Sequence, residues 1–447
     1  MVTSKARCCV ASTIHLNLFV HGRGHHEAGW RHPSASRQPL TDIDYFASLA
    51  RRAEEGKFDS VFFADYLALN DDIGHVAGAA LEPITLLAAL ARATRHIGLI
   101  ATVSTTYSEP FNIARQFASV DHISHGRAGW NIVTSWLPHA SRNFGLNAPL
   151  ALQDRYERAE EYVRTATQLW DSWADDAIVD DPQAGRYADL DRVGPIAHEG
   201  KHFSVNGPLN IPRSPQGWPV LVQAGSSPAG KAFAAKFAEA VFTAHLRKES
   251  AQQFYQELKT LTEQQGRKAS QIVILPGLSA TLGSTEHEAR VLSRELNELT
   301  HFQVGLERLS NRFGGHDFTG INPDLPLSAD DFPDAGAVQA SQSRSKAIIE
   351  LVTREHPTLR QLLHRLAGAR GHFTLAGTPE QVADAILDWV DSGAADGFNV
   401  MPPVLPRQLD LFIEHVVPIL QARGRFRKEY EHTTLRGHYG LDRPAGR

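Results

Sequence analysis

Residues 219–238, PVLVQAGSSPAGKAFAAKFA, carry the residue types of an anion site. The pattern predicts a buried strand, a turn at Gly225, and a helix with Ser227 at its N-cap and Pro228 at its first position. Free amides at the start of such a helix, with the hydroxyls of Ser226 and Ser227, would attract a phosphate group. A capped helix without a ligand is the alternative.

Two further polar residues stand where predicted strands end. Asp65 closes the run FFAD, and Thr102 lies near the end of IGLIATVS. In a parallel barrel both would lie at the carboxyl end of the strands, where the active sites of that fold gather, and could hydrogen-bond a ring or a substrate. Alternatively, Asp65 caps a turn and Thr102 is an ordinary strand residue.

Tyr156 stands on a predicted helix, QDRYERAEEY, beside Arg155. Its hydroxyl could reach a phosphate or a sugar-like chain while its ring packs on the barrel, or the residue could serve packing alone. The loop GRGHHEAGWRHP contains His25 and His26 but lacks the spacing of a metal site, so we predict no metal. His25, His26 and the distant His372 are weak candidates for proton transfer.

Apolar, β-branched runs alternate with segments of helical period, as in βαβ units. Eight strands are predicted, at residues 14–20, 58–64, 96–103, 127–134, 219–225, 240–245, 271–280 and 397–402. Eight helices are predicted, at residues 41–56, 82–95, 110–124, 153–173, 228–238, 248–265, 284–300 and 378–392. This α/β pattern favours a closed (β/α)8 TIM barrel, with an open doubly wound sheet as the rival.

Two regions interrupt the alternation, near 174–218 and 301–377. We predict a single barrel domain over 1–447 with insertions at these two places. The second insertion is our candidate for a lid, and its segment 322–336, NPDLPLSADDFPDAG, is predicted to be an exposed connection.

Composition narrows the class of function. A net charge of -5 gives no basic field for nucleic acid or an anionic membrane, so small-molecule chemistry fits better. No stretch approaches the ~20 apolar residues that span a bilayer. The two cysteines, Cys8 and Cys9, are adjacent and cannot build a disulfide framework, which predicts a cytoplasmic protein. The usual signatures for nicotinamide, nucleotide and serine-nucleophile sites do not occur, which favours an external source of reducing equivalents.

A series of motifs runs along nearly the whole sequence: GHHEAGWRHP, GKFDSVFFAD, EPITLLAALARATRHIGLIATVSTTYSEPFNIAR, DHISHGRAGWNIVTS, RNFG, RYERAEEYV, HEGKHFSV, QAGSS, SQSRSKAI, LAGARGH and GTPEQVAD. In these segments the chain resembles the nitrilotriacetate monooxygenase component A and dibenzothiophene-sulfone monooxygenase group of the bacterial-luciferase-like flavoproteins.

This resemblance implies a monooxygenase that uses molecular oxygen and reduced FMN supplied by a separate NAD(P)H:flavin reductase. It implies a small organic substrate, commonly with C–N or C–S bonds, and a homodimer. Carried over by motif, Asp65 and Thr102 correspond to contacts at the isoalloxazine end of FMN, and Tyr156, Ser226 and Ser227 to phosphate contacts. The family often has His four residues before the tyrosine, where this chain has Leu152, which puts flavin affinity in doubt.

Two other functions remain open from the sequence. One is a deazaflavin-dependent oxidoreductase of the same superfamily, which would transfer hydride without oxygen. The other is a non-catalytic flavin-binding protein, with the Leu152 departure as its support. Substrate identity depends on loop side chains around the pocket and does not follow from these motifs.

Overall fold

The structure is a computed structural model that describes residues 13–69, 71–78, 80–333 and 342–446. Cys8 and Cys9 lie outside the described residues. None of the helices described is long and apolar enough to cross a membrane.

Eight parallel strands form a closed ring. In chain order they are β1 (His15–Val20), β2 (Ser60–Phe63), β3 (Gly98–Ser104), β4 (Ala128–Val133), β9 (Val220–Gln223), β10 (Ala240–Thr243), β11 (Val273–Leu282) and β13 (Gly397–Val400). Each strand pairs with its neighbour along this order, and β1 pairs with β13 to close the ring. The predicted barrel is therefore confirmed, and the open-sheet alternative is wrong.

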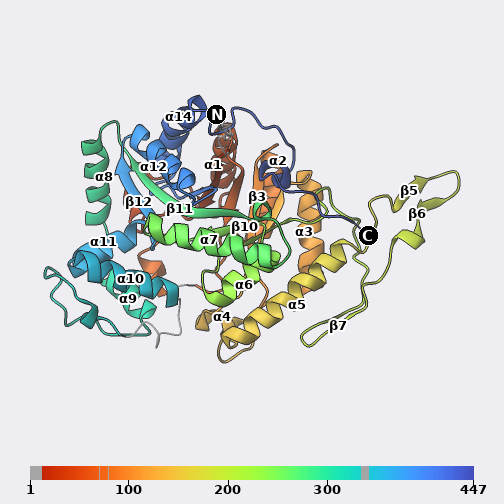
Figure 1. Cartoon of the computed structure of the whole chain (residues 1–447), viewed down its shortest axis with the longest axis horizontal. Helices are drawn as coiled ribbons and strands as arrows, with labels where there is room; N and C mark the ends of the chain where they lie inside the picture. The colour runs from red at the N-terminus through yellow and green to blue at the C-terminus, as the bar shows by residue number, and fades with distance from the viewer. Residues whose placement is uncertain (1–12, 70, 79, 334–341, 447) are drawn as a thin grey trace, which may run out of the picture.

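The predicted helices are all present and surround the ring (Figure 1). They are α1 (Ile43–Glu55), α2 (Pro83–Ala93), α3 (Pro110–Ser124), α5 (Leu152–Trp170), α6 (Pro228–Phe237), α7 (Lys248–Gln264), α8 (Glu286–Glu298) and α12 (Pro379–Asp391). Four of them, α2, α3, α6 and α12, begin with proline, whose fixed φ suits the first helical position. Shorter helices are α4 (Pro138–Asn143), α13 (Arg407–Leu411), α14 (Val417–Ala422) and α15 (Leu435–His438).

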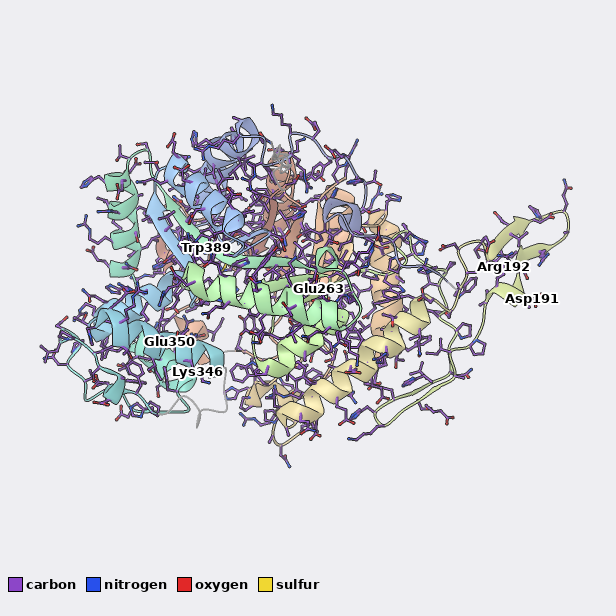
Figure 2. The ribbon with its side chains drawn as sticks, in the orientation of Figure 1. Asp191, Arg192, Glu263, Lys346, Glu350 and Trp389 are labelled. Carbon is purple, nitrogen blue, oxygen red and sulfur yellow. The ribbon has the colours of Figure 1, made fainter. Side chains whose placement is uncertain are left out.

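The first insertion forms an arm that extends away from the barrel (Figure 1). It carries the hairpin of β5 (Ile178–Asp181) and β6 (Arg186–Ala188) and the short pair of β7 (His198–Glu199) and β8 (Ser204–Val205). Asp191 and Arg192 lie on this arm in Figure 2.

The second insertion is more structured than the sequence predicts. It contains α9 (Phe302–Arg312), α10 (Gln342–Glu355), which carries Lys346 and Glu350 in Figure 2, and α11 (Leu359–Ala369). A ninth strand, β12 (Phe373–Gly377), pairs with the outer half of β11. The expected exposed connection at 322–336 is wrong for Leu327 and Phe332, because both are buried in the insertion's own apolar core.

The end of the chain closes the barrel at the amino ends of its strands. Leu435 and Tyr439 pack among the residues that fill the barrel interior, and the Tyr439 hydroxyl donates to Asn17 Oδ1 at 2.8 Å. A Cβ built at Gly98 would lie only 2.4 Å from Leu435 Cδ1, so glycine is needed for this close approach. With that end filled among the described residues, the carboxyl ends of the strands, which we call the mouth, are the end of the barrel at which we expect a ligand to enter.

Candidate active site at the barrel mouth

Thr102 and Asn131 form a polar pair inside the mouth. Both are 3% exposed, and Asn131 Nδ2 donates to Thr102 Oγ1 at 2.8 Å. The Thr102 hydroxyl thus keeps its own hydrogen for donation, while Asn131 Oδ1 has no partner among the described residues. A donor and an acceptor side by side suit a ring with amide-like N–H and C=O groups.

The turn between β9 and α6 has the predicted geometry. The Ser227 side chain caps the helix by accepting from Gly230 N at 3.1 Å, and Pro228 follows at the first position. Ser226 precedes this cap in the same turn. A Cβ built at Gly225 or Gly230 would lie 3.1 or 3.0 Å from the Tyr156 hydroxyl, so the tyrosine reaches this turn. The fold therefore brings the three residues predicted for phosphate together.

Other buried polar atoms at the same end of the barrel also lack hydrogen-bond partners in the part of the chain that the structure describes. They are His25 Nδ1, Thr106 Oγ1, Arg155 Nε and Gln223 Oε1, in addition to Asn131 Oδ1. Buried polar groups in native proteins are nearly always paired with protein, water or ligand. This concentration of unpaired atoms fits a site that a polar ligand completes, and a flavin with its ribityl phosphate has matching groups.

Asp65 lies two residues after the end of β2 and is partly buried. Burial, with a smaller effect of the nearby Glu82 carboxylate, raises the pKa of Asp65 to about 6. Glu82 is held in place because it caps α2 by accepting from Ile84 N at 2.8 Å and Thr85 N at 2.7 Å. Asp65 can therefore gain or lose a proton close to neutral pH.

The raised pKa of Asp65 predicts a pH-dependent effect of Asp65→Asn. A carboxyl whose pKa is higher in the folded state contributes stability that is present below about pH 4 and is lost as pH rises through about 6. At pH 8 the free energy of unfolding of Asp65→Asn should be about 1 to 2 kcal/mol higher than that of the wild-type protein, after allowance for solvent screening. At pH 4 the difference should disappear. Urea titrations at both pH values test this, with the exposed Asp330→Asn as control; a pH-independent difference would contradict it.

The three histidine candidates have separate surroundings. His25 donates from Nε2 to the Phe19 carbonyl at 2.9 Å, and burial lowers its pKa to about 3, so it stays neutral near pH 7. His372 stacks on Phe242 with ring centroids 4.9 Å apart. A role in proton transfer stays a prediction for both, and since His25 Nε2 donates, its Nδ1 is the ring nitrogen that can accept a hydrogen bond.

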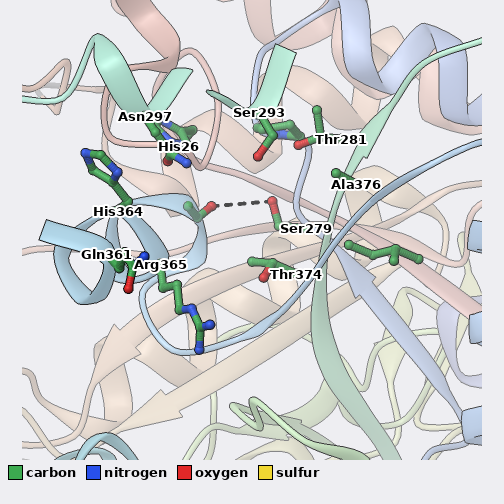
Figure 3. A pocket seen from close by; sticks show the side chains of 13 residues that line it. His26, Ser279, Thr281, Ser293, Asn297, Gln361, His364, Arg365, Thr374 and Ala376 are labelled. Atoms are coloured by element: carbon green, nitrogen blue, oxygen red, sulfur yellow. Dashed lines mark hydrogen bonds between the residues drawn. The ribbon is translucent and has the colours of Figure 1, made fainter. Parts of the chain in front are cut away.

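His26 belongs to a different place in the fold. Its Nε2 lies 3.2 Å from Asn297 Oδ1, and it lines a polar cavity of about 360 Å³ between α8, α11 and the β11–β12 pair (Figure 3). No other predicted site residue lines this cavity. The structure thus separates His26 from the group formed by Thr102, Tyr156 and Ser226.

Leu152 is the first residue of α5 and is 50% exposed. It lies one helical turn before Tyr156 and therefore on the same face. An imidazole at this position would be near the tyrosine, whereas leucine offers no polar atom there.

The sequence analysis did not select Asn131 or Gln223 as site residues. Both are polar residues in otherwise apolar strands, WNIV and VLVQ, and both are buried. A polar side chain inside a predicted buried strand is the signal that could have found them, because its burial requires a partner.

Replacing both Ser226 and Ser227 with alanine should weaken FMN binding by ~1 to 3 kcal/mol, because hydrogen bonds to phosphate would be lost. Fluorescence titration of FMN measures this. Thr378→Ala, which removes the N-cap of α12, is the matched control for the loss of a helix cap. Unchanged FMN affinity in the double variant would contradict a phosphate site at this turn.

Comparison with known proteins agrees with this geometry. A family model described as luciferase-like monooxygenase matches residues 19–396. The chain is 48% identical to N-acetyl-S-(2-succino)cysteine monooxygenase of Bacillus subtilis, covering 97% of this chain and 98% of that protein. It is 46% identical to nitrilotriacetate monooxygenase component A of Aminobacter aminovorans, covering 96% and 97%. The solved EDTA monooxygenase of Chelativorans sp. BNC1 superimposes with a TM-score of 0.79 at 36% identity, covering 96% and 99%.

Proposed function

Because the chain belongs to the luciferase-like monooxygenase family, we propose that the mouth of its barrel binds reduced FMN through the residues described above. The resemblance noted in the sequence is confirmed. The protein is a flavin-dependent monooxygenase of the two-component type, which oxidises small substrates with C–N or C–S bonds. This assignment favours the two-component monooxygenase over the deazaflavin-dependent and non-catalytic alternatives.

The observation that carries the FMN proposal is the set of unpaired buried polar atoms at the mouth. We assign Thr102, Asn131 and Asp65 to the ring end of the cofactor. Tyr156, with Ser226 and Ser227, is assigned to the phosphate end, at the positive end of the α6 dipole. Bound reduced flavin supplies the electrons for oxygen activation, and the protein contributes binding, orientation and exclusion of water.

The name "component A" of the nitrilotriacetate relative indicates that a second component works with it. We propose that this chain likewise receives reduced FMN from a separate NAD(P)H:flavin reductase. Its sequence lacks the glycine-rich signature of a nicotinamide site, which agrees with an external source of reducing equivalents.

We further propose that α9 and α11 of the second insertion cover the mouth as a lid. Arg308 on α9 forms ion pairs with Glu27, in the loop after β1, and with Asp72, in the loop after β2. These pairs fasten α9 to two loops of the mouth. Protection of the insertion from protease when flavin and substrate bind is the expected behaviour.

Oxygen consumption tests the proposed function. Purified protein, FMN, NADH and a generic flavin reductase are supplied with a panel of amines, thioethers and sulfones, and oxygen uptake and oxidised product are measured. We expect product with at least one compound, in amounts equal to the oxygen consumed above the reductase background. Absence of product across the panel, despite FMN binding, would favour a non-catalytic flavin-binding protein.

We propose that the chain forms a homodimer through the arm of the first insertion. Tyr187 and Leu190 are 66% and 81% exposed on this arm, and burying these side chains against a second copy would be favourable. Leu190→Asp should raise the dissociation constant of the dimer by about tenfold or more, whereas Asp191→Asn should not change it. Light scattering over a concentration series measures this. A monomeric wild-type protein would contradict the proposal.

Two other predictions from the sequence stay proposals. One is that the barrel and its insertions form a single domain over 1–447. The other is a cytoplasmic location, which rests on the cysteine content.

A further inference from the structure

Arg370 stands at a turn that directs it to the mouth. It is the C-cap of α11, with a φ of 55° in the left-handed region, and Gly371 follows with a φ of 93°. This turn places Arg370 Nη2 2.6 Å from Nε2 of His21, the first residue after β1. The second insertion therefore contributes a cation to the carboxyl end of the barrel.

The protonation state of His21 follows from this contact. A guanidinium can only donate, so His21 Nε2 accepts the hydrogen bond and its other ring nitrogen, Nδ1, carries the hydrogen. Burial and, secondarily, the positive charge of Arg370 lower the pKa of His21 well below its ordinary value. The pair thus has a single positive charge and a neutral ring with one remaining N–H.

Arg370 differs from the neighbouring arginines of the insertion in its ion pairing. Arg360 and Arg365 on α11 pair with Asp324 and Glu355, and Arg308 pairs with two carboxylates. For Arg370 no carboxylate lies within ion-pair distance in the ranges that the structure describes. A partly buried guanidinium without a counter-ion is an unfavourable arrangement unless an anion completes it.

The pair adjoins the proposed flavin site. The His21 ring lies 6.2 Å from that of Tyr66, which directly follows Asp65, and 5.5 Å from that of His25. Phe19, whose ring is 4.5 Å from His25, belongs to the apolar filling of the barrel interior. A ligand at Arg370 would therefore lie between the polar residues of the mouth and the aromatic side chains that fill the barrel interior.

We propose that Arg370 forms a subsite for a carboxylate of the substrate, with His21 as its positioning residue. The substrate class is then a small organic acid that carries the C–S or C–N bond to be oxidised. A planar guanidinium matches a carboxylate in a two-point hydrogen bond, which fixes orientation as well as charge. The type of reaction in this inference rests on the proposed function. The carboxylate in the ligand rests on the geometry around Arg370.

A matched pair of ligands tests the subsite by equilibrium binding. Thiodiacetate and its dimethyl ester share one thioether skeleton and differ in charge. Isothermal titration calorimetry of the full-length protein, without reductase or turnover, should show binding of thiodiacetate that is at least tenfold tighter than that of the ester. Arg370→Met should weaken the binding of thiodiacetate about 10- to 100-fold and leave the affinities for the ester and for FMN unchanged.

Four further variants complete the test. Arg360→Met, on the same helix but paired with Asp324, should bind thiodiacetate normally. His21→Phe should weaken the binding of thiodiacetate. His21→Gln, whose amide can accept a hydrogen bond from Arg370 and still donate one, should largely restore that binding. No binding to the wild-type protein, equal binding of acid and ester, or full binding by Arg370→Met would overturn the subsite. Loss of binding in Arg365→Met instead would place the anion in the cavity of Figure 3 and also overturn it.

Failure of this subsite and failure of the proposed function are distinguishable. The calorimetric result does not depend on oxygen or on electron transfer, whereas the oxygen-uptake experiment does not depend on carboxylates.

Discussion

Asn131→Leu is expected to weaken FMN binding about 10- to 100-fold. The substitution keeps the side-chain volume but removes both the amide that donates to Thr102 and the unpaired Oδ1 that faces no protein donor among the described residues. Loss of hydrogen bonds of this kind costs about 1 to 3 kcal/mol. Titration of the protein with FMN, followed by flavin fluorescence, gives the affinity.

Asn399→Leu is the matched control for this variant. Asn399 is equally buried on β13, but its Nδ2 donates to the Leu275 carbonyl at 3.1 Å, so its role is internal. It should lower the stability of the fold and leave FMN affinity unchanged in the folded protein. Equal losses of FMN affinity in both variants would show that the effect of Asn131→Leu is a general consequence of disturbing the barrel.

Asp59→Asn is expected to lower the free energy of unfolding by about 3 to 5 kcal/mol. The Asp59 carboxylate is fully buried, accepts from Leu16 N at 2.7 Å, and pairs with His15 and Arg427. Burial alone would raise the pKa of Asp59, but the positive charge of Arg427, together with the contact to His15, outweighs it and lowers that pKa to about 2. An amide in its place would leave the Arg427 guanidinium, which is 10% exposed, without its counter-ion.

Urea unfolding measures the cost of Asp59→Asn. The control is Glu429→Gln in the same C-terminal segment, which breaks only the surface pair with Lys57, where Glu429 is 81% exposed. Glu429→Gln should lower the free energy of unfolding by less than about 1 kcal/mol. Since Arg427 precedes the residues that fill the closed end of the barrel, a near-neutral Asp59→Asn would mean that this segment is held by apolar packing alone.

The barrel could be predicted from the sequence because its strands and helices have local signals. Each strand is a short apolar run, and most of the helices that follow have a start signal, such as Ser227 and Pro228 before α6. Parallel strands bury both faces, which explains why these runs are nearly continuous in apolar residues. The two serines proposed to contact phosphate could also be selected from local signals, because Ser226 and Ser227 lie in the same turn.

The contacts between residues in the rest of the site could not be predicted in this way, because they depend on closure of the ring and on the insertions. Thr102 and Asn131 are 29 residues apart and meet only because β3 and β4 pair in one register. Arg370 and His21 are 349 residues apart, and their contact requires the folded second insertion. Sequence reasoning also missed the helices α9 to α11, because the proline- and aspartate-rich segment among them indicated an exposed loop.

A crystal structure of the protein with FMN tests the central claim most directly. We expect the phosphate within hydrogen-bond distance of Ser226 and Tyr156 at the start of α6, and the ring beside Thr102 and Asn131. FMN bound instead in the cavity between α8 and α11, or on the outer surface of the barrel, would contradict the account.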